Sequence, residues 1–130
     1  MEKAVTIEQL DGGDALIEWF GAIPSFHDAT LLTLELRQAG DSLLRAPTFR
    51  IGPEIDAEGY FVQTKSVVVN FHIFNILEAE LFEFMEAGIM DGLVVHVDAG
   101  GTELSWGSSY GVYGRLKAKE VTLSFEPTQP

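Results

Sequence analysis

The feature that most constrains the fold is an alternation of apolar and polar residues that recurs in several stretches of the chain. It is clearest between positions 66 and 73, where Val67, Val69, Phe71 and Ile73 alternate with polar residues or valine. Successive side chains of a β-strand point to opposite faces, so this pattern predicts a strand with one buried face. Several such stretches in a short chain predict a β-sheet.

Other stretches extend this predicted sheet. The alternation recurs at 31–37, with Leu32, Leu34 and Leu36 on one face, at 93–98, and at 120–126. Turn residues at 38–41 and 99–101 predict hairpins that return through 43–51 and 104–106. Pro47 indicates a sheet edge or a bulge in the first of these returning strands. We expect a loop at 52–59, a turn at 107–111 and a frayed end at 127–130.

The segment from Ile7 to Gly21 has mainly helical spacing. Ile7 and Leu10 suggest a short helical turn, which Gly12-Gly13 interrupts. A better helix should then begin with Asp14 as N-cap and end at Gly21, before Pro24.

The stretch 74–88 allows two interpretations. As a helix it has Asn75 as a cap and an apolar stripe that ends at Gly88. As a strand it has Leu77, Ala79 and Leu81 facing inward, and turns helical only at Glu83. Both interpretations leave the carboxylates of this stretch facing water.

Length and composition predict one domain spanning 1–130. Of the 130 residues 46% are apolar and none is cysteine, so the chain has enough apolar material for a core without disulfides. The predicted fold class is α+β, a curved antiparallel sheet of about six strands with an N-terminal helix. Without a secretory signal or a long apolar run, a cytoplasmic protein is expected.

The charge is large and unevenly distributed. Twenty Asp and Glu against eight Lys and Arg give a net charge of −12, which argues against nucleic acid as a partner because phosphates require basic side chains. Positions 66–114 contain no Lys or Arg at all, whereas acidic residues recur there. The pattern predicts an acidic surface.

The three histidines are the candidates for catalytic or metal-binding chemistry. His27 beside Asp28 suggests either function, but neighbouring side chains of an extended segment diverge, so we expect a structural role. His72 and His96 lie on polar faces, and together with Asp98 they would offer metal ligands if their strands were neighbours. No motif supports this, and the sequence predicts neither a cofactor nor an enzyme.

A segment at the predicted helix-to-strand junction carries a family resemblance. The run Trp19-Phe20-Gly21-Ala22-Ile23-Pro24-Ser25-Phe26-His27-Asp28-Ala29, leading into the 31–37 strand, resembles the opening of the immunity protein 50 family of bacterial polymorphic-toxin systems. The resemblance extends along the chain in layout, but it is specific only around Pro24, Phe26, His27 and Asp28. It implies a non-enzymatic protein that binds and neutralises a cognate toxin, and it gives these four residues as family-typical positions that fit a scaffold role.

Many bacterial toxins are nucleases with basic surfaces, and an acidic inhibitor complements such a surface. The predicted toxin-facing carboxylates are Glu78, Glu80, Glu83, Glu86, Asp91 and Glu103. Two alternatives stay open: a small-molecule-binding module with His72 and His96 lining a cleft, and a metal-dependent enzyme. The sequence leaves the oligomeric state and the toxin's identity open.

Overall fold

The structure is a computed structural model that describes residues 7–27, 29–55, 57–59, 61–84 and 88–128, with the backbone alone at 50–55 and 61–64. A 3-10 turn, η1 (Ile7–Gln9), precedes the helix α1 (Gly13–Phe20). The strands of the described residues are β1 (Thr33–Glu35), β2 (Asp41–Ile55), β3 (Phe61–Phe82), β4 (Ile89–Met90), β5 (Val94–Asp98), β6 (Gly101–Trp106), β7 (Ser108–Tyr110) and β8 (Tyr113–Thr128).

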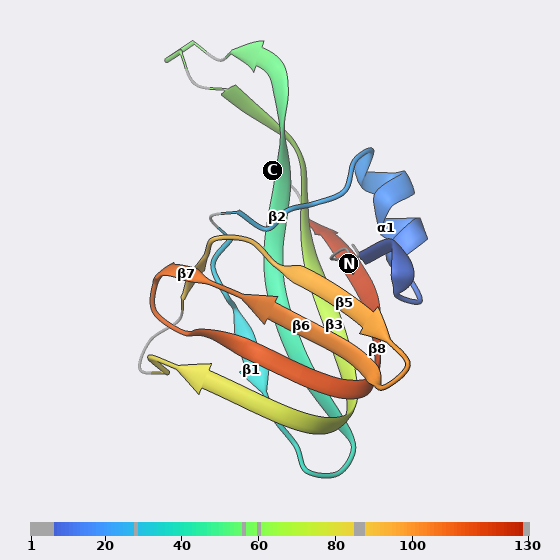
Figure 1. Ribbon diagram of the computed structural model, residues 1–130. Coiled ribbons are helices and arrows are strands. Elements are labelled where there is room, and N and C mark those ends of the chain that lie inside the picture. The colour runs from blue at the N-terminus through green and yellow to red at the C-terminus, as the bar shows by residue number, and fades with distance from the viewer. Residues whose placement is uncertain (1–6, 28, 56, 60, 85–87, 129–130) are drawn as a thin grey trace.

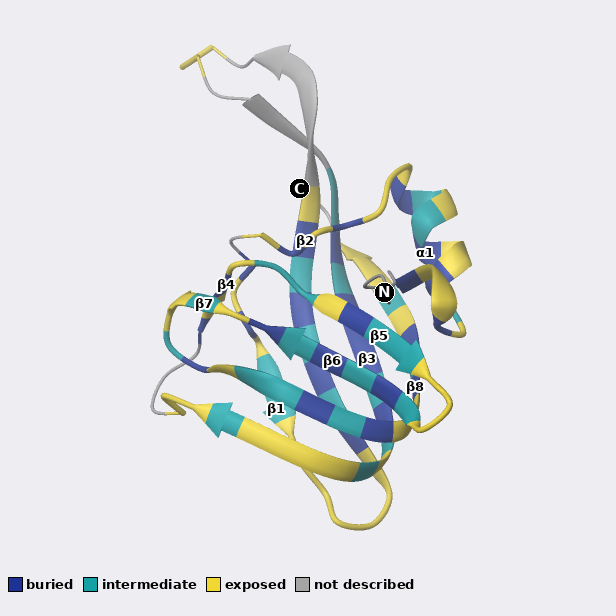
Figure 2. Cartoon of the chain, viewed as in Figure 1, coloured by how far each residue is buried: buried dark blue, intermediate teal, exposed yellow. Residues whose placement is uncertain are grey.

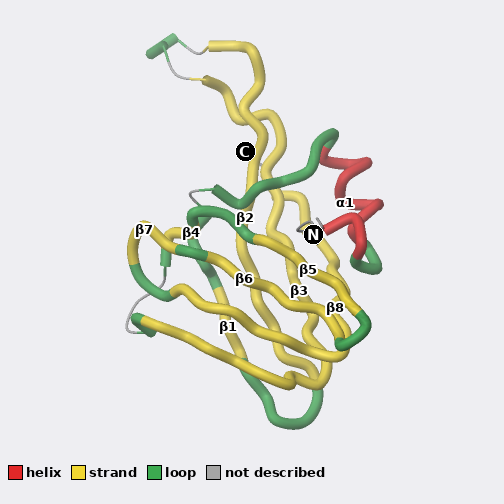
Figure 3. The backbone as a smooth tube through the Cα atoms, in the orientation of Figure 1, coloured by secondary structure: helices red, strands yellow, loops and turns green. Residues whose placement is uncertain are grey.

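One antiparallel sheet makes up most of the molecule. Its six strands follow the order β1-β2-β3-β8-β6-β5, and β4 and β7 form a separate two-stranded ladder. Figure 3 shows that α1 lies at one side of this sheet. The predicted α+β class, with a six-stranded antiparallel sheet and an N-terminal helix, is confirmed.

The sheet folds over on itself, because β3 and β8 each run through two layers. β3 pairs with β2 as far as Phe74 and with β8 as far as Phe82. Asn75 has a φ of 59°, and the β3–β8 register shifts between Ile76 and Glu78. Such bulges bend a strand. In Figure 1 the last part of β3, the first part of β8, β6 and β5 therefore cross in front of β1, β2 and the remaining parts of β3 and β8.

The core lies between these two layers. The inward residues of β3 that the alternation predicts, Val67, Val69, Phe71 and Ile73, are all buried. Facing residues come from the other layer and belong to the same buried cluster: Val95, Leu104, Trp106, Leu116 and Ala118. Figure 2 shows buried positions alternating with more exposed ones along β6 and β8. Apolar burial of this kind is the main favourable contribution to folding.

The ambiguous stretch 74–88 is a strand as far as Phe82, so the helical interpretation is wrong. The predicted inward face is only partly right, because Leu81 packs on the core while Leu77 is 48% exposed. Leu77 lies at the register shift, where the regular alternation is broken. Ala79 pairs with the buried Leu116, yet it is exposed because β3 is an edge strand here.

The first predicted strand is shorter than expected. β1 pairs with β2 only from Thr33 to Glu35, and of the predicted inward face only Leu34 packs on the core. Leu32 and Leu36 are exposed because they lie just beyond the two ends of this short edge ladder.

The second predicted strand is longer than expected. The predicted loop at 52–59 is wrong in its first part, since β2 continues to Ile55. Pro47 lies inside this strand. The carbonyl of Arg45 accepts a hydrogen bond from the N–H of Leu32, on the β1 side of β2. The backbone nitrogen of Pro47, two residues further on, faces the same side. The β1 ladder does not extend that far, so the missing N–H of Pro47 interrupts no pairing.

Three turn and terminus predictions also need correction. Gly12, with a φ of 93°, is the N-cap of α1, and Asp14 lies in the first turn; Gly21 ends the helix as predicted. The turn expected at 107–111 contains β7. Pro127 and Thr128 are not frayed but pair with β3, and 129–130 lie outside the described residues.

The close approach of hairpin β5–β6 to β8 requires glycine at position 101. Gly101 has a φ of 137°, and a Cβ atom there would overlap the carbonyl oxygen of Ala118. Gly40 also has a left-handed φ, 89°, but no atom lies near its missing side chain.

We therefore expect Gly101→Ala to lower the free energy of unfolding by about 3 kcal/mol, through backbone strain and steric overlap together. Gly40→Ala, which adds the strain alone, should cost about 1 kcal/mol. Urea denaturation of both variants measures the difference, and equal losses would contradict this packing.

Candidate functional site

The family-typical segment lies where the chain passes from α1 to β1. Pro24 is buried, and Phe26 is 1% exposed with its ring centroid 5.7 Å from that of Phe71 in the core. Phe26 has a φ of 62°, an uncommon conformation for a large residue, which the surrounding packing must hold. Pro24 and Phe26 are therefore both packed inside the protein.

His27 joins this segment to a second one. Its side chain is exposed, and Nδ1 donates a hydrogen bond to the carbonyl oxygen of Asp91 at 3.1 Å. Backbone bonds run alongside, from Met90 to Ala29 and from Leu93 to Ser25. His27 therefore helps to hold 25–29 against 90–93, and Asp28 lies outside the described residues.

The other two histidines are not neighbours. His72 lies on β3 and His96 on β5, with β8 and β6 between them in the sheet. Nε2 of His72 is 2.9 Å from Oγ of Ser124, whereas Nε2 of His96 is 3.7 Å from a carboxylate oxygen of Asp98. In the part of the chain that is described, no three His, Asp or Glu side chains gather as metal ligands.

Three of the predicted toxin-facing carboxylates meet around one cation. Nε of Arg115 lies 2.6 Å from Glu80, and its Nη1 lies 3.4 Å from Glu78 and 3.3 Å from Glu103. The hydrogen bond that Arg115 donates to Glu80 is the main reason that the pKa of Arg115 is raised. The charge of Glu80 and the interactions with Glu78 raise it further, while burial opposes them. The guanidinium stays charged at every pH the protein encounters.

The strand register explains this meeting. β8 lies between β3 and β6, and it places Arg115 opposite Glu80 and Lys117 between Glu78 and Glu103. Lys117 also lies 4.0 Å from Asp98, at the end of β5. We call this set the outer charged network; it consists of Glu78, Glu80, Asp98, Glu103, Arg115 and Lys117.

The remaining predicted carboxylates lie elsewhere. Glu83 follows the end of β3 with a φ of 57°, and Asp91 lies beside His27. Glu86 lies outside the described residues. The described members of the predicted set thus do not form one continuous surface.

An exposed aromatic pair, which the sequence pattern does not indicate, adjoins the outer charged network. Phe82 and Tyr113 stack with centroids 5.1 Å apart, and they are 48% and 38% exposed. They are cross-strand partners, and their pair lies two residues along the strands from the pair of Glu80 and Arg115. A register for β3 and β8 would have revealed the pair, but the alternation alone does not specify register.

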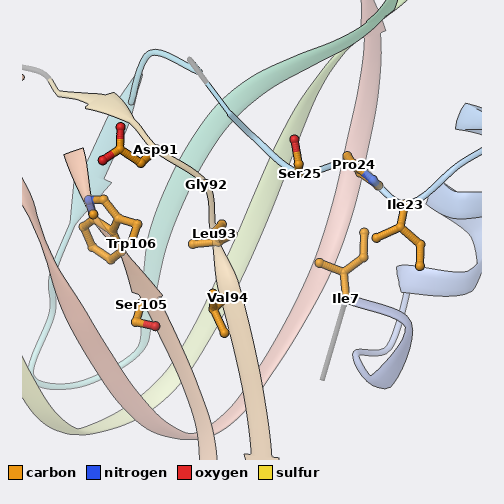
Figure 4. A pocket seen from close by; sticks show the side chains of 11 residues that line it. Ile7, Ile23, Pro24, Ser25, Asp91, Gly92, Leu93, Val94, Ser105 and Trp106 are labelled. Carbon is orange, nitrogen blue, oxygen red and sulfur yellow. The ribbon is translucent and has the colours of Figure 1, made fainter. Parts of the chain in front are cut away.

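A groove lies between the start of β5 and the junction that follows α1. It has a volume of about 590 Å³, and its lining includes Asp91, Leu93 and Trp106 on one side and Ile7 and Ile23 on the other. Figure 4 shows the Asp91 carboxylate at one end and the two isoleucines at the other. His72 and His96, which the sequence suggested for a cleft, do not line it.

Comparison with known proteins leaves the resemblance as an expectation. No protein-family model matches the chain, and no curated protein or solved structure matches it either.

The helical content gives one further observation. Within the described residues, no helix has both the length and the apolar character needed to cross a bilayer.

The scaffold role of the junction can be measured. Phe26→Ala should lower the free energy of unfolding by about 3 to 5 kcal/mol, because it empties a filled core position. His27→Ala removes an exposed hydrogen bond and should cost only about 1 kcal/mol. Thermal or urea unfolding compares the two, and a loss at His27 as large as that at Phe26 would contradict the assignment.

Proposed function

We propose that this protein acts by binding and not by catalysis, and that in the cytoplasm it neutralises a protein toxin with a basic surface. The observation that carries the proposal is the outer charged network, in which four carboxylates surround two cations across β3, β8, β6 and the end of β5. The network keeps a negative excess, in a chain whose net charge is −12.

The fixed geometry of these carboxylates favours binding. Glu78, Glu80 and Glu103 are held by Arg115, so less side-chain freedom is lost when a partner's cations approach them. A partner arginine or lysine then meets carboxylates that are already oriented. The negative field of the whole chain also accelerates encounter with a basic protein.

The stacked aromatic pair adds an apolar contact that the outer charged network does not provide. Protein interfaces place most of their binding energy in a few aromatic or arginine residues, surrounded by polar groups. Phe82 and Tyr113 offer such an anchor next to the outer charged network. The contact surface we propose is therefore this pair together with Glu78, Glu80 and Glu103.

The choice of a toxin as partner rests on the family resemblance around Phe26-His27. Immunity proteins of this kind bind a cognate toxin, and toxins that cleave nucleic acids carry basic surfaces. Acidity and an exposed aromatic anchor are consistent with that partner. A nuclease is accordingly the toxin class that we expect.

The first experiment uses the reading frames beside the gene. Each neighbouring product is expressed with and without this protein, and growth is measured together with the association rate of the purified pair. We expect one neighbour to be toxic alone and harmless in co-expression. If no neighbour is both bound and neutralised, the proposed function is wrong.

Isosteric substitutions then locate the contact surface. Glu78→Gln, Glu80→Gln and Glu103→Gln combined should slow association about tenfold at low salt and flatten its salt dependence. The matched control combines Asp14→Asn, Glu18→Gln and Asp41→Asn, which removes the same charge from exposed positions elsewhere. Equal slowing by both triples would mean that net charge alone acts, and would remove this surface from the proposal.

The aromatic anchor has its own test. Phe82→Ala should speed dissociation of the toxin about tenfold, because it removes a central apolar contact. Phe49→Ala is the matched control, since Phe49 on β2 is 44% exposed and lies away from the outer charged network. Surface plasmon resonance measures both, and an unchanged dissociation rate for the Phe82 variant would contradict the anchor.

A further inference from the structure

The groove beside β5 is independent of the proposed toxin surface and has a chemistry of its own. We propose that it is a binding site for a small organic ammonium ion, that is, a primary amine carried on an apolar body. The proposal depends on the shape of the groove, on its lining and on the single carboxylate at one end.

The size and lining of the groove fit a small molecule. Its volume of about 590 Å³ lies within the usual range for ligand sites, which are mostly apolar with a few polar groups. The apolar lining comes from separate parts of the chain: Ile7 from η1, Ile23 and Pro24 from the junction, Leu93 and Val94 near the start of β5, and Trp106 from the end of β6. The polar side chains in the lining are Ser25, Asp91 and Ser105.

The walls of the groove are held in place by hydrogen bonds. The N–H of Leu93 donates to Ser25 at 3.2 Å, and the N–H of Asp91 donates to Gly107 at 3.1 Å. The carbonyl of Asp91 accepts from His27, and the indole N–H of Trp106 donates to the carbonyl of Val112. The groove is therefore formed before any ligand arrives, which reduces the entropy cost of binding.

The Asp91 carboxylate is available to a ligand. Among the described residues, no lysine, arginine or histidine forms an ion pair with it. Gly107 lies next to it, and even a Cβ atom at that position would come only to ordinary contact, 3.6 Å from Oδ2. The absence of a side chain at position 107 leaves the approach to the carboxylate open.

The arrangement of polar and apolar groups specifies the ligand class. Asp91 and the edge of Trp106 lie at one end of the groove, and Ile7, Ile23 and Pro24 lie at the other (Figure 4). A cation beside Asp91 would therefore extend an apolar tail along Leu93 toward the isoleucines. Anions are disfavoured by Asp91 and by the net charge of −12.

The probe pair is 3-phenylpropylamine and its neutral counterpart 3-phenylpropanol. Each is titrated into isotope-labelled protein, and the amide signals of Leu93, Val94 and Gly107 are followed by NMR together with the indole N–H of Trp106; a Trp19→Phe variant assigns the indole signal. We expect groove-localised shifts, with a dissociation constant on the order of 1 mM for the amine. The alcohol should bind about threefold more weakly, since an exposed ion pair contributes modestly.

Two variants test the role of the carboxylate. Asp91→Asn should remove the preference for the amine and leave the affinity for the alcohol unchanged. Asp41→Asn removes the same charge from an exposed position away from the groove and should preserve the preference. Added salt should erode the amine preference in the wild-type protein and in the Asp41→Asn control, and should have no preference to erode in Asp91→Asn.

Three results would overturn the proposal. They are shifts spread over the surface instead of the groove, equal affinity for amine and alcohol in the wild-type protein, and an amine preference that survives Asp91→Asn. Gly107→Leu, which fills the approach to Asp91, adds a steric check: if the groove is the site, both probes lose affinity. None of these results depends on a toxin, so this proposal and the proposed function fail independently.

Discussion

The bend in β3 and β8 is the constraint on which the rest of the structure depends. In a flat six-stranded sheet, the apolar face that carries Val67, Phe71 and their neighbours would be exposed to water. A single short helix is too small to cover this face. Because the sheet folds over, the last part of β3 and the first part of β8, together with β6 and β5, cover the first part of β3 and the last part of β8. A strand that passes from one layer to another turns its corner at a bulge, here at Asn75 and at the register shift between Ile76 and Glu78.

Much of the fold could be predicted because alternation reports burial directly. The 66–73 strand, the 99–101 turn and the end of α1 at Gly21 all follow from local pattern. The secondary structure of 74–82 could not be predicted in this way, because the helical and strand patterns of its sequence have similar strength. The strand forms because β8 offers a long partner there, and pairing across 30 or more residues leaves no local signal.

The arrangement of charges in the candidate site also could not be predicted from local sequence. Along the sequence, basic residues are missing from 66–114, which suggests a bare acidic surface. In the sheet, however, β8 inserts Arg115 and Lys117 between β3 and β6, so that segregation along the chain becomes alternation in space. The carboxylates of Glu78, Glu80 and Glu103 are consequently ordered by internal ion pairs. They remain in excess, but in a fixed arrangement that composition could not specify.

The junction around Phe26 connects the fold to both candidate surfaces. Phe26 is buried against Phe71 of the back layer, while His27 and Ser25 bond to Asp91 and Leu93 at the entrance to β5 in the front layer. The segment therefore sets the distance between the layers on one side, as the bend in β3 does on the other. It also forms one wall of the groove through Ile23, Pro24 and Ser25. Because the packing of Phe26 against Phe71 fixes the position of this segment, the contacts that stabilise the core also hold this wall of the groove in place.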